Sequence, residues 1–204
     1  CSFCDVVTVN PTERIDKEDE RPFVGLEDLS VSTMYFVAKE QRKGPVGPKF
    51  RNGDVLFPRI TPSVENGKRG FVMTLADGEV AQGSTEFIVL REKVLTAEHI
   101  YFLSVSEGFR TNAELSMTGA SGRQRVQEQC FNQFLVKTPP PDLRQKFTDL
   151  VRPMVSQIRL LSAQTENLTR TRDLLLPRLL SGKLRVDDLS IQFPPSMADA
   201  APAA

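Results

Sequence analysis

The sequence predicts an α+β fold in which one globular domain is followed by a long helix. Residues 1–141 mix strand-like and helix-like apolar patterns and contain no internal repeat, which is typical of a single α+β domain. From Phe147 onward, apolar residues recur at alternating steps of four and three, the spacing of a helix edge that pairs with another helix. Pro177 and Gly182 then supply signals that close a helix.

Turn residues followed by apolar runs mark the strands of the globular part. By this criterion we expect strands at 23–30, 53–60, 69–75 and 85–91. Residues 96–112 change to a helical pattern, with Thr96 placed to cap its start. Residues 130–140 resemble a last short strand that runs into the three prolines at 139–141, which cannot continue a sheet.

The long helix is expected to begin after these prolines, with Asp142 as its cap or first-turn acid. Pro153 predicts either a kink or the start of a second helix. A one-sided apolar stripe needs a partner helix, from another copy, another subunit or a missing half of the chain. The predicted helix-pairing residues are Phe147, Val151, Met154, Ile158, Leu161, Leu168, Leu175 and Leu179. The expected domains are 1–141, a helical region at 142–189 and a disordered tail at 190–204.

Charge is balanced over the whole chain but not along it. The formal net charge is +0, which argues against a uniformly basic nucleic-acid binder. Residues 1–40 carry nine acids against four bases, whereas residues 42–70 carry seven bases against two acids. The second segment therefore predicts a locally basic surface, with an ordinary solvated loop as the alternative.

Motifs for catalysis or metal binding are weak. Cys1 and Cys4 form half of a zinc site, and Cys130 and the single histidine, His99, would have to complete it. No phosphate-binding glycine loop and no acid-x-lysine pair occur, so we expect no catalytic residue and no metal site. An apolar run of about 20 residues is also absent, so we expect a cytoplasmic protein with no membrane contact.

Three stretches resemble the specificity subunits of type I restriction-modification systems. The words "RDLLLPRLLSGKL" at 172–184 closely resemble the conserved helical region of that family. "GDVLFPRI" at 53–60 and "TGASGRQRV" at 118–126 resemble stretches of its target-recognition domains, with Pro58 where a serine is common. Full-length family members contain two recognition domains and two helical regions, so this chain, which begins at Cys1, resembles one half.

The resemblance implies a non-catalytic subunit that reads one half of a bipartite double-stranded DNA target. Its helix would act as a ruler, as a dock for modification subunits and as a pairing element for a second recognition half or a homodimer. The chain itself would bind no cofactor. Modification subunits would bring S-adenosylmethionine, and restriction subunits would bring ATP and Mg.

Loop cations and glycines are the expected DNA contacts. Cations after residue 58 and in the 118–126 loop would hold phosphates, and Arg123, Arg125 or Gln124 could also reach base edges. The predicted DNA-binding residues are Arg59, Ser63, Lys68, Arg69, Ser84, Thr85, Thr118, Gly119, Ser121, Gly122, Arg123, Gln124 and Arg125. The main alternative is a coiled-coil scaffold protein that binds no DNA. A small enzyme that uses His99 is a third possibility with little support.

Overall fold

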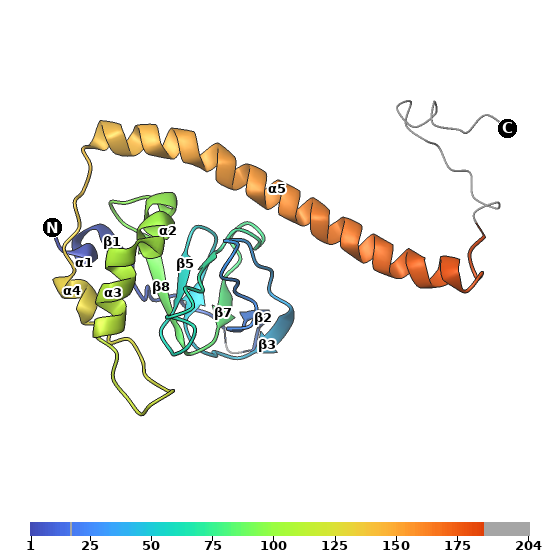
Figure 1. The fold of residues 1–204 in the computed structure, drawn as a ribbon, viewed down its shortest axis with the longest axis horizontal. Helices are drawn as coiled ribbons and strands as arrows, with labels where there is room; N and C mark the ends of the chain where they lie inside the picture. The colour runs from blue at the N-terminus through green and yellow to red at the C-terminus, as the bar shows by residue number, and fades with distance from the viewer. Residues whose placement is uncertain (17, 186–204) are drawn as a thin grey trace. The chain divides into compact units, whose positions relative to one another are not determined.

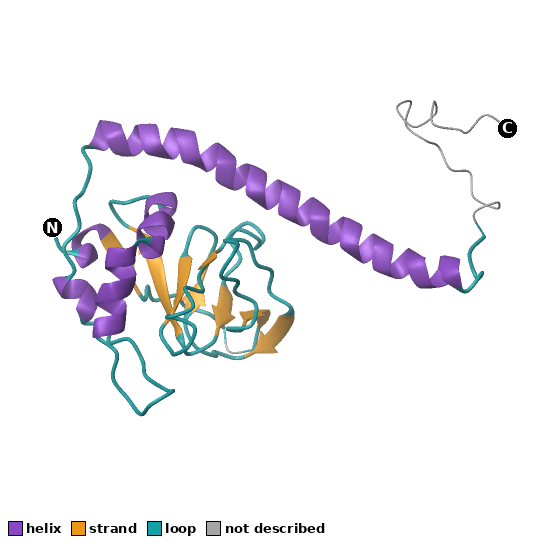
Figure 2. Cartoon of the chain, viewed as in Figure 1, coloured by secondary structure: helices purple, strands orange, loops and turns teal. Residues whose placement is uncertain are grey.

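The computed structural model describes residues 1–16 and 18–185 and divides into two units. The first unit, Cys1–Leu160, contains two sheets and the shorter helices, and the second starts at Leu161 within a long helix. The predicted α+β class with a long C-terminal helix is therefore confirmed (Figures 1 and 2). The tail predicted at 190–204 lies outside the described residues.

Two four-stranded sheets form the globular unit (Figure 2). The first, which is antiparallel throughout, has the order β1 (Val7–Val9), β8 (Phe87–Glu92), β5 (Val55–Pro58) and β6 (Gly70–Phe71). The second has the order β3 (Glu40–Lys43), β2 (Glu20–Val24), β7 (Ala81–Gly83) and β4 (Lys49–Phe50), with β2 parallel to β7.

The predicted strands are confirmed where both of their faces are buried. In β5 and β8, alternate residues enter two different clusters: Val55 and Leu90 join one, whereas Leu56 and Val89 join the other. Burial on both faces gives a continuous apolar run, which the sequence shows clearly. The segment at 69–75 shortens to β6, and the segment at 23–30 overlaps β2 only at its first two residues. The other strands were missed because they are short, and β3 is exposed along its whole length.

Helices cover the outer face of the first sheet. They are α1 (Phe3–Val6), α2 (Ala97–Val105), α3 (Glu107–Leu115) and α4 (Cys130–Gln133). The single helix predicted at 96–112 is wrong, because Ser106 has an extended backbone and its side chain caps α3 by accepting from the Phe109 amide at 3.4 Å. The strand predicted at 130–140 is also wrong: α4 occupies its start, and only Leu135 makes a bridge, to Ser2.

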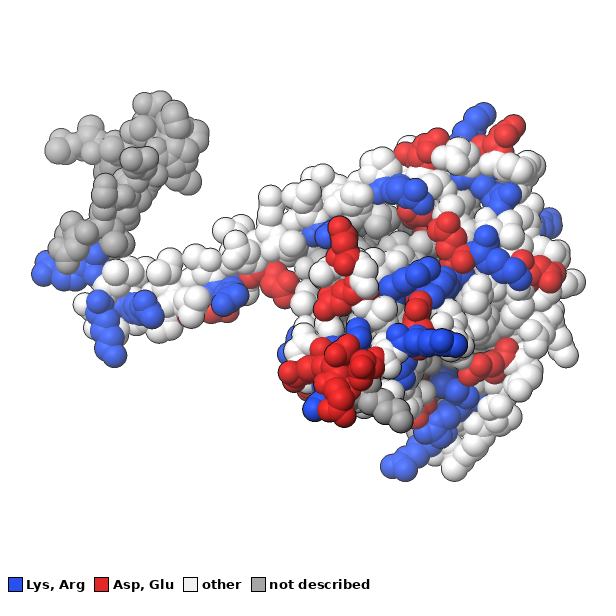
Figure 3. Space-filling view, turned by 180° about the vertical axis from the view of Figure 1, so that it is seen from behind, with Lys and Arg blue, Asp and Glu red and all other residues white. Residues whose placement is uncertain are grey.

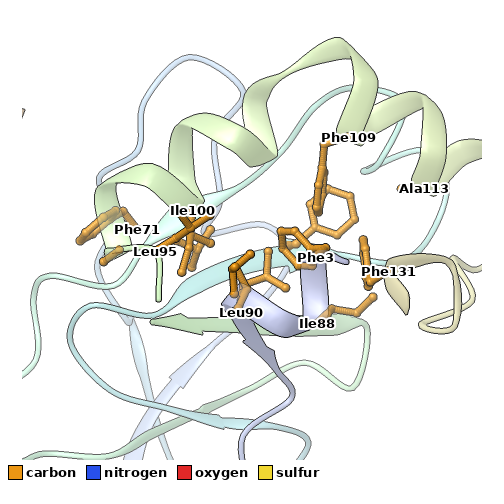
Figure 4. Packing of buried hydrophobic residues seen from close by; sticks show 14 of the residues in the cluster. Phe3, Phe71, Ile88, Leu90, Leu95, Ile100, Phe109, Ala113 and Phe131 are labelled. Carbon is orange, nitrogen blue, oxygen red and sulfur yellow. The ribbon is translucent and has the colours of Figure 1, made fainter. Parts of the chain in front are cut away.

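Aromatic rings fill the space between these helices and the sheet (Figure 4). Phe109 stacks on Phe131 with ring centroids 5.2 Å apart, and Phe57 meets Phe109 edge-on at 5.2 Å. Phe3 packs against the same group from α1. Since each of these rings is at most 1% exposed, they contribute large apolar areas and geometrically specific contacts to one core.

The long helix, α5 (Pro141–Leu180), is one unbroken element that passes through Pro153, so no second helix starts there. Asp142 lies in its first turn, as predicted. Gly182 adopts a φ of 67°, and its amide donates to the carbonyl of Leu179 at 3.1 Å. This left-handed glycine closes the helix in the way that the sequence indicates.

Candidate nucleic-acid interface

Backbone hydrogen bonds bring together three segments that are distant in sequence: 59–63 after β5, 84–86 before β8, and the loop at 116–127 after α3. The amide of Arg59 donates to the carbonyl of Glu86 at 2.8 Å, and the amide of Val126 donates to the carbonyl of Arg59 at 2.7 Å. We call this convergence the three-loop surface. It joins most of the residues that the sequence predicts as DNA contacts.

The loop at 116–127 is a hairpin with an exposed tip. Thr118 and Arg125 exchange two backbone hydrogen bonds of 3.1 and 2.9 Å, and residues 118–123 are exposed. Gly119 and Gly122 have φ values of 129° and 77°, which disfavour any residue with a Cβ. In Figure 1 this hairpin is the yellow-green loop that projects beyond α3. Its glycines therefore allow a close approach of backbone to a ligand.

Carboxylates neutralise two of the three arginines on this surface. Arg125 forms a bidentate pair with Glu86 at 2.6 and 2.9 Å, and Arg59 lies 3.2 Å from Glu128. The hydrogen bond from Arg125 lowers the pKa of Glu86 below its ordinary value. Arg123 is exposed and forms no ion pair within the described part of the chain. The surface therefore carries a small positive excess and one free guanidinium.

The two glutamates were not among the predicted site residues. Glu86 meets Arg125 across 39 positions, and Glu128 meets Arg59 across 69 positions, so neither pair leaves a local pattern in the sequence. Figure 3 shows the same mixing on a larger scale, since blue and red side chains interleave over the globular part of that face. Acids and bases are thus mixed locally as well as along the chain, with a small positive excess at the three-loop surface.

Of the predicted DNA contacts, Lys68 and Arg69 lie outside the three-loop surface, and Ser63, at the end of its first segment, is buried. Arg69 is 6% exposed, and its guanidinium donates to the carbonyls of Gly67, at 3.0 Å, and Ser104. Ser63 is 8% exposed, and the Nζ of Lys68 donates to the carbonyl of Leu26 at 3.0 Å. We expected the cations of this turn to be exposed to solvent. Instead, Lys68 and Arg69 donate hydrogen bonds to backbone carbonyls of the domain.

Ser84 and Thr85 occupy a tight turn beside the hairpin. The hydroxyl of Ser84 accepts a hydrogen bond from the Glu86 amide at 3.2 Å, which fixes the turn, and Thr85 is exposed. Gln124 is partly buried, and its carbonyl accepts from the Thr61 amide at 3.1 Å. The exposed positions of this surface are therefore Pro62, Thr85, the hairpin tip at 118–123 and Arg125.

The predicted helix-pairing residues of α5 fall into two groups. Phe147 and Val151 pack against the globular domain: the Phe147 ring lies 4.2 Å from that of His99, and Val151 borders the main core cluster. The prediction that Phe147 and Val151 pair with a partner helix is therefore wrong, because both pack against the domain of their own chain. The other six are 37–69% exposed, and they are Met154, Ile158, Leu161, Leu168, Leu175 and Leu179.

Polar contacts fix the start of α5 on the globular domain. The guanidinium of Arg152 donates to Glu98 at 2.7 Å, and the hydroxyls of Thr96 and Thr148 are 3.2 Å apart. Burial raises the pKa of Glu98, but hydrogen bonds from Arg152, the backbone and Thr96 outweigh it, so the net shift is downward. Burial lowers the pKa of His99, whose Nδ1 lies 2.9 Å from the Thr96 hydroxyl.

The cysteines do not assemble a metal site among the residues described. Cys1, Cys4 and Cys130 are free thiols, and no group of three His, Cys, Asp or Glu side chains in the described ranges could hold a metal ion. No helix within residues 1–16 and 18–185 is both long and apolar enough to cross a bilayer.

Curated proteins with similar sequences are specificity subunits of type I restriction enzymes. No family model matches the chain. The chain is 30% identical over 148 residues, 68% of its length, to the type I restriction enzyme EcoEI specificity subunit of Escherichia coli. It is 31% identical over 104 residues, half of its length, to the EcoAI specificity subunit of the same organism. These matches span 24% and 17% of the two relatives, so the chain covers about a quarter or less of their length.

Solved structures share the fold. The crystal structure of the HsdS subunit from Thermoanaerobacter tengcongensis matches 96% of this chain with a TM-score of 0.58 at 18% identity, and 51% of that subunit is covered. A chain from a structural study of the assembly and conformational transition of a type I R-M system matches equally well, with a TM-score of 0.58. Sequence and fold together confirm the resemblance carried by the motifs at 53–60, 118–126 and 172–184. The chain is homologous to the specificity subunits of type I restriction enzymes.

Proposed function

We propose that this chain recognises one half of a bipartite DNA target for a type I restriction-modification enzyme. The observation that carries the proposal is the convergence of three separated loops on one surface that ends in an exposed glycine hairpin with a free arginine. Arg123 can approach a phosphate or the edge of a guanine, because a guanidinium donates two parallel hydrogen bonds. The glycines on both sides let the backbone come close to the duplex.

The small charge excess predicts weak binding by the isolated chain. Each phosphate that a protein neutralises adds about −0.9 to the slope of log affinity against log salt. Arg59 and Arg125 already have carboxylate partners, so only a few phosphates can be neutralised here. Tight, selective binding then requires a second recognition half on the same duplex.

The exposed edge of α5 supplies that connection in our proposal. Its six exposed apolar residues would pair with the helix of a second half or of another copy, which sets the spacing between two recognition domains. The assembled helices would also bind modification subunits, which bring S-adenosylmethionine. Restriction subunits would add ATP and Mg, and this chain would contribute recognition without catalysis.

A gel-shift titration against a random duplex at about 50 and 200 mM salt tests the proposal. The wild-type chain should bind weakly and lose affinity as salt rises. Replacing Arg123 and Arg125 with Ala should lower affinity about tenfold at the lower salt, because two phosphate or base contacts are lost. As a matched control, Arg14→Ala with Lys146→Ala removes two exposed charges that lie outside the three segments of this surface and should change affinity less than twofold.

Glu86 offers a variant that should change binding in the opposite direction. Glu86→Gln removes a carboxylate that neutralises Arg125, so affinity should rise severalfold and the salt slope should steepen by about 0.9. Absence of binding by the wild-type chain at both salt concentrations would instead favour a scaffold role. Equal binding by the wild type and the double-alanine variant would exclude the hairpin as the contact.

A further inference from the structure

A polar cleft lies between the end of α2, the first turns of α3 and the loop at 66–69. Its volume is about 260 Å³, far above the roughly 30 Å³ that one water molecule occupies in the liquid. Five of its lining residues carry hydrogen-bond donors, namely Ser32, Asn66, Arg69, Tyr101 and Arg110. The cleft is separate from the three-loop surface, although the segment 59–69 runs from one to the other.

Arg69 brings a buried charge to this cleft without a balancing carboxylate. Its guanidinium donates to the carbonyls of Gly67 and Ser104, and no acid in the described part of the chain forms an ion pair with it. Carbonyls at the end of a helix offset only part of a full positive charge. Burial, together with nearby Arg110, lowers the pKa of Arg69, and Tyr101 partly opposes that shift. Buried charges are normally paired, so this arginine has capacity for an anion.

Arg110 adds a second guanidinium to the same wall. Its Nε is buried without a hydrogen-bond partner, and a carboxylate oxygen of Glu114 lies 3.4 Å away without hydrogen-bond geometry. Arg69 and Arg110 together face one acid, which leaves an excess of one positive charge. An orphaned donor beside an unbalanced charge is a feature that a bound anion would correct.

The donors favour a tetrahedral oxyanion over a carboxylate. A carboxylate is planar and is matched by one arginine fork, whereas a phosphate has several oxygens that accept from different directions. This cleft offers two guanidinium groups from α3 and the 66–69 loop, together with the hydroxyl of Tyr101 and the amide of Asn66. Donors from separate elements suit a phosphate group.

We infer that the cleft lined by Arg69 and Arg110 binds a phosphate group. The source that fits best is a phosphodiester of the DNA backbone outside the recognised bases, and this choice of source rests on the proposed function. Free phosphate has the same chemistry and serves as the probe. A contact of this kind would add affinity and fix the orientation of the duplex without reading sequence.

Thermal unfolding in phosphate and in chloride at equal ionic strength tests the inference. At inorganic phosphate about ten times its Kd, the wild-type midpoint should rise by about 2–5 °C. Arg110→Gln should reduce the rise to below about 1 °C, because one guanidinium is lost. The control, Arg21→Gln, removes an arginine that also has a buried Nε without a partner but lies in β2, and it should respond like the wild type. Phosphate also stabilises proteins nonspecifically, and that effect is equal in all three chains.

A spectroscopic measurement removes the dependence on variants. The Nε–Hε resonance of Arg69 should shift saturably with phosphate in the wild-type chain, whereas that of Arg21 should not. Two results would overturn the inference. One is an equal rise of the midpoint in the wild type and Arg110→Gln, and the other is an Arg69 chemical shift that does not change with phosphate.

DNA then identifies the source of the phosphate. If a duplex supplies it, Arg110→Gln should bind a random duplex about threefold to tenfold more weakly, and bound duplex should abolish the midpoint rise with free phosphate. If DNA affinity is unchanged while free phosphate still binds, the cleft serves a phosphate-bearing small molecule. Failure of the chain to bind any DNA would refute the proposed function. The phosphate measurements would still show whether the cleft binds phosphate.

Discussion

The two halves of α5 carry the same apolar spacing but are covered in different ways. In the half that belongs to the globular unit, Val155 and Thr148 are buried, and Phe147 and Val151 contact the domain. In the half from Leu161 onward, every apolar residue of the edge is exposed, as at Leu168, which is 69% exposed. One continuous pattern is therefore covered by the domain in one half and exposed in the other. The spacing of apolar residues shows that an edge will be covered, and not which surface covers it.

Polar partners distinguish the two halves. In the first half, Arg152 pairs with the buried Glu98 of the domain, and the hydroxyl of Thr148 contacts that of Thr96. In the second half, the hydroxyls of Thr165 and Thr171 donate to the helix's own carbonyls at Leu161 and Asn167. Directional contacts thus fix one half in a single position, whereas the other half presents an exposed apolar edge, which we propose pairs with a partner helix.

The largest difference is expected when the same charge is placed in each half. Val155→Asp puts a carboxylate where the wild-type side chain is 8% exposed, and it should weaken the contact between residues 141–160 and the domain by about 3 kcal/mol. Leu168→Asp, at an exposed site, should change the stability of the monomer by no more than about 0.5 kcal/mol. Hydrogen exchange of amides 142–160 measures both. Equal loss of protection in the two variants would erase the distinction between the halves.

Association should show the reverse sensitivity. Leu161→Asp with Leu168→Asp should weaken pairing of the helix by at least about 100-fold, or roughly 2.7 kcal/mol, because two charges enter an apolar edge. Ala163→Asp with Asn167→Asp adds the same charges on the opposite side of the helix and should leave pairing within about threefold of the wild type. Sedimentation equilibrium over micromolar concentrations reports both. Identical masses for the two double variants would show that the edge is not the pairing surface.

The ion pair in the first half should have a moderate effect. Arg152→Gln leaves the carboxylate of Glu98 buried without its cation, which should cost about 1–3 kcal/mol in urea denaturation. Adding Glu98→Gln should restore part of that loss, since two amides can bond to each other. Arg159→Gln, at an exposed neighbour with no ion pair among the described residues, should be nearly neutral. A cost for Arg159→Gln equal to that for Arg152→Gln would exclude a specific role for the pair.

The smallest expected effect is a dependence on pH through His99. Burial lowers the pKa of His99 below 6.5, partly opposed by Glu98 and reinforced by Arg144. Between the lowered pKa and 6.5 the unfolded chain binds more protons, so stability should be full above pH 6.5 and fall as the pH decreases through this window. His99 is the single histidine, so His99→Gln should flatten the change measured by urea denaturation between pH 7.5 and 5.5. A slope that persists in this variant would place the titrating group elsewhere.

The sequence predicted those parts of the fold whose signal is local. The strands β5 and β8, Asp142 in the first turn and Gly182 at the helix end all follow from adjacent residues. The missed strands are short and depend on partners far along the chain, as when β2 lies parallel to β7. The break at Ser106 was missed because apolar periodicity continues across it, and only the cap interrupts the backbone.

The candidate site was predicted in its location more than in its electrostatics. The loop at 118–126 was identified from its resemblance to a stretch of the family's recognition domains, and the structure shows that it is a hairpin. The pairing of Arg125 with Glu86 depends on the 116–127 hairpin meeting the turn before β8, and the burial of Arg69 depends on the carbonyl of Ser104 in the last turn of α2. Such contacts depend on the folded structure and cannot be predicted from composition, which shows only that cations and acids are equally numerous.

The burial of β5 and β8 on both faces has a consequence for how binding preference can change. The three-loop surface lies where β5 ends and β8 begins, at Arg59 and Glu86, and a backbone hydrogen bond of 2.8 Å joins these two residues. The buried strands β5 and β8 fix the positions at which the loops start, whereas the exposed tip residues do not pack against these strands. Substitutions at the tip should therefore leave the buried framework unchanged, and under the proposed DNA-binding role such tolerance would ease the acquisition of a new target.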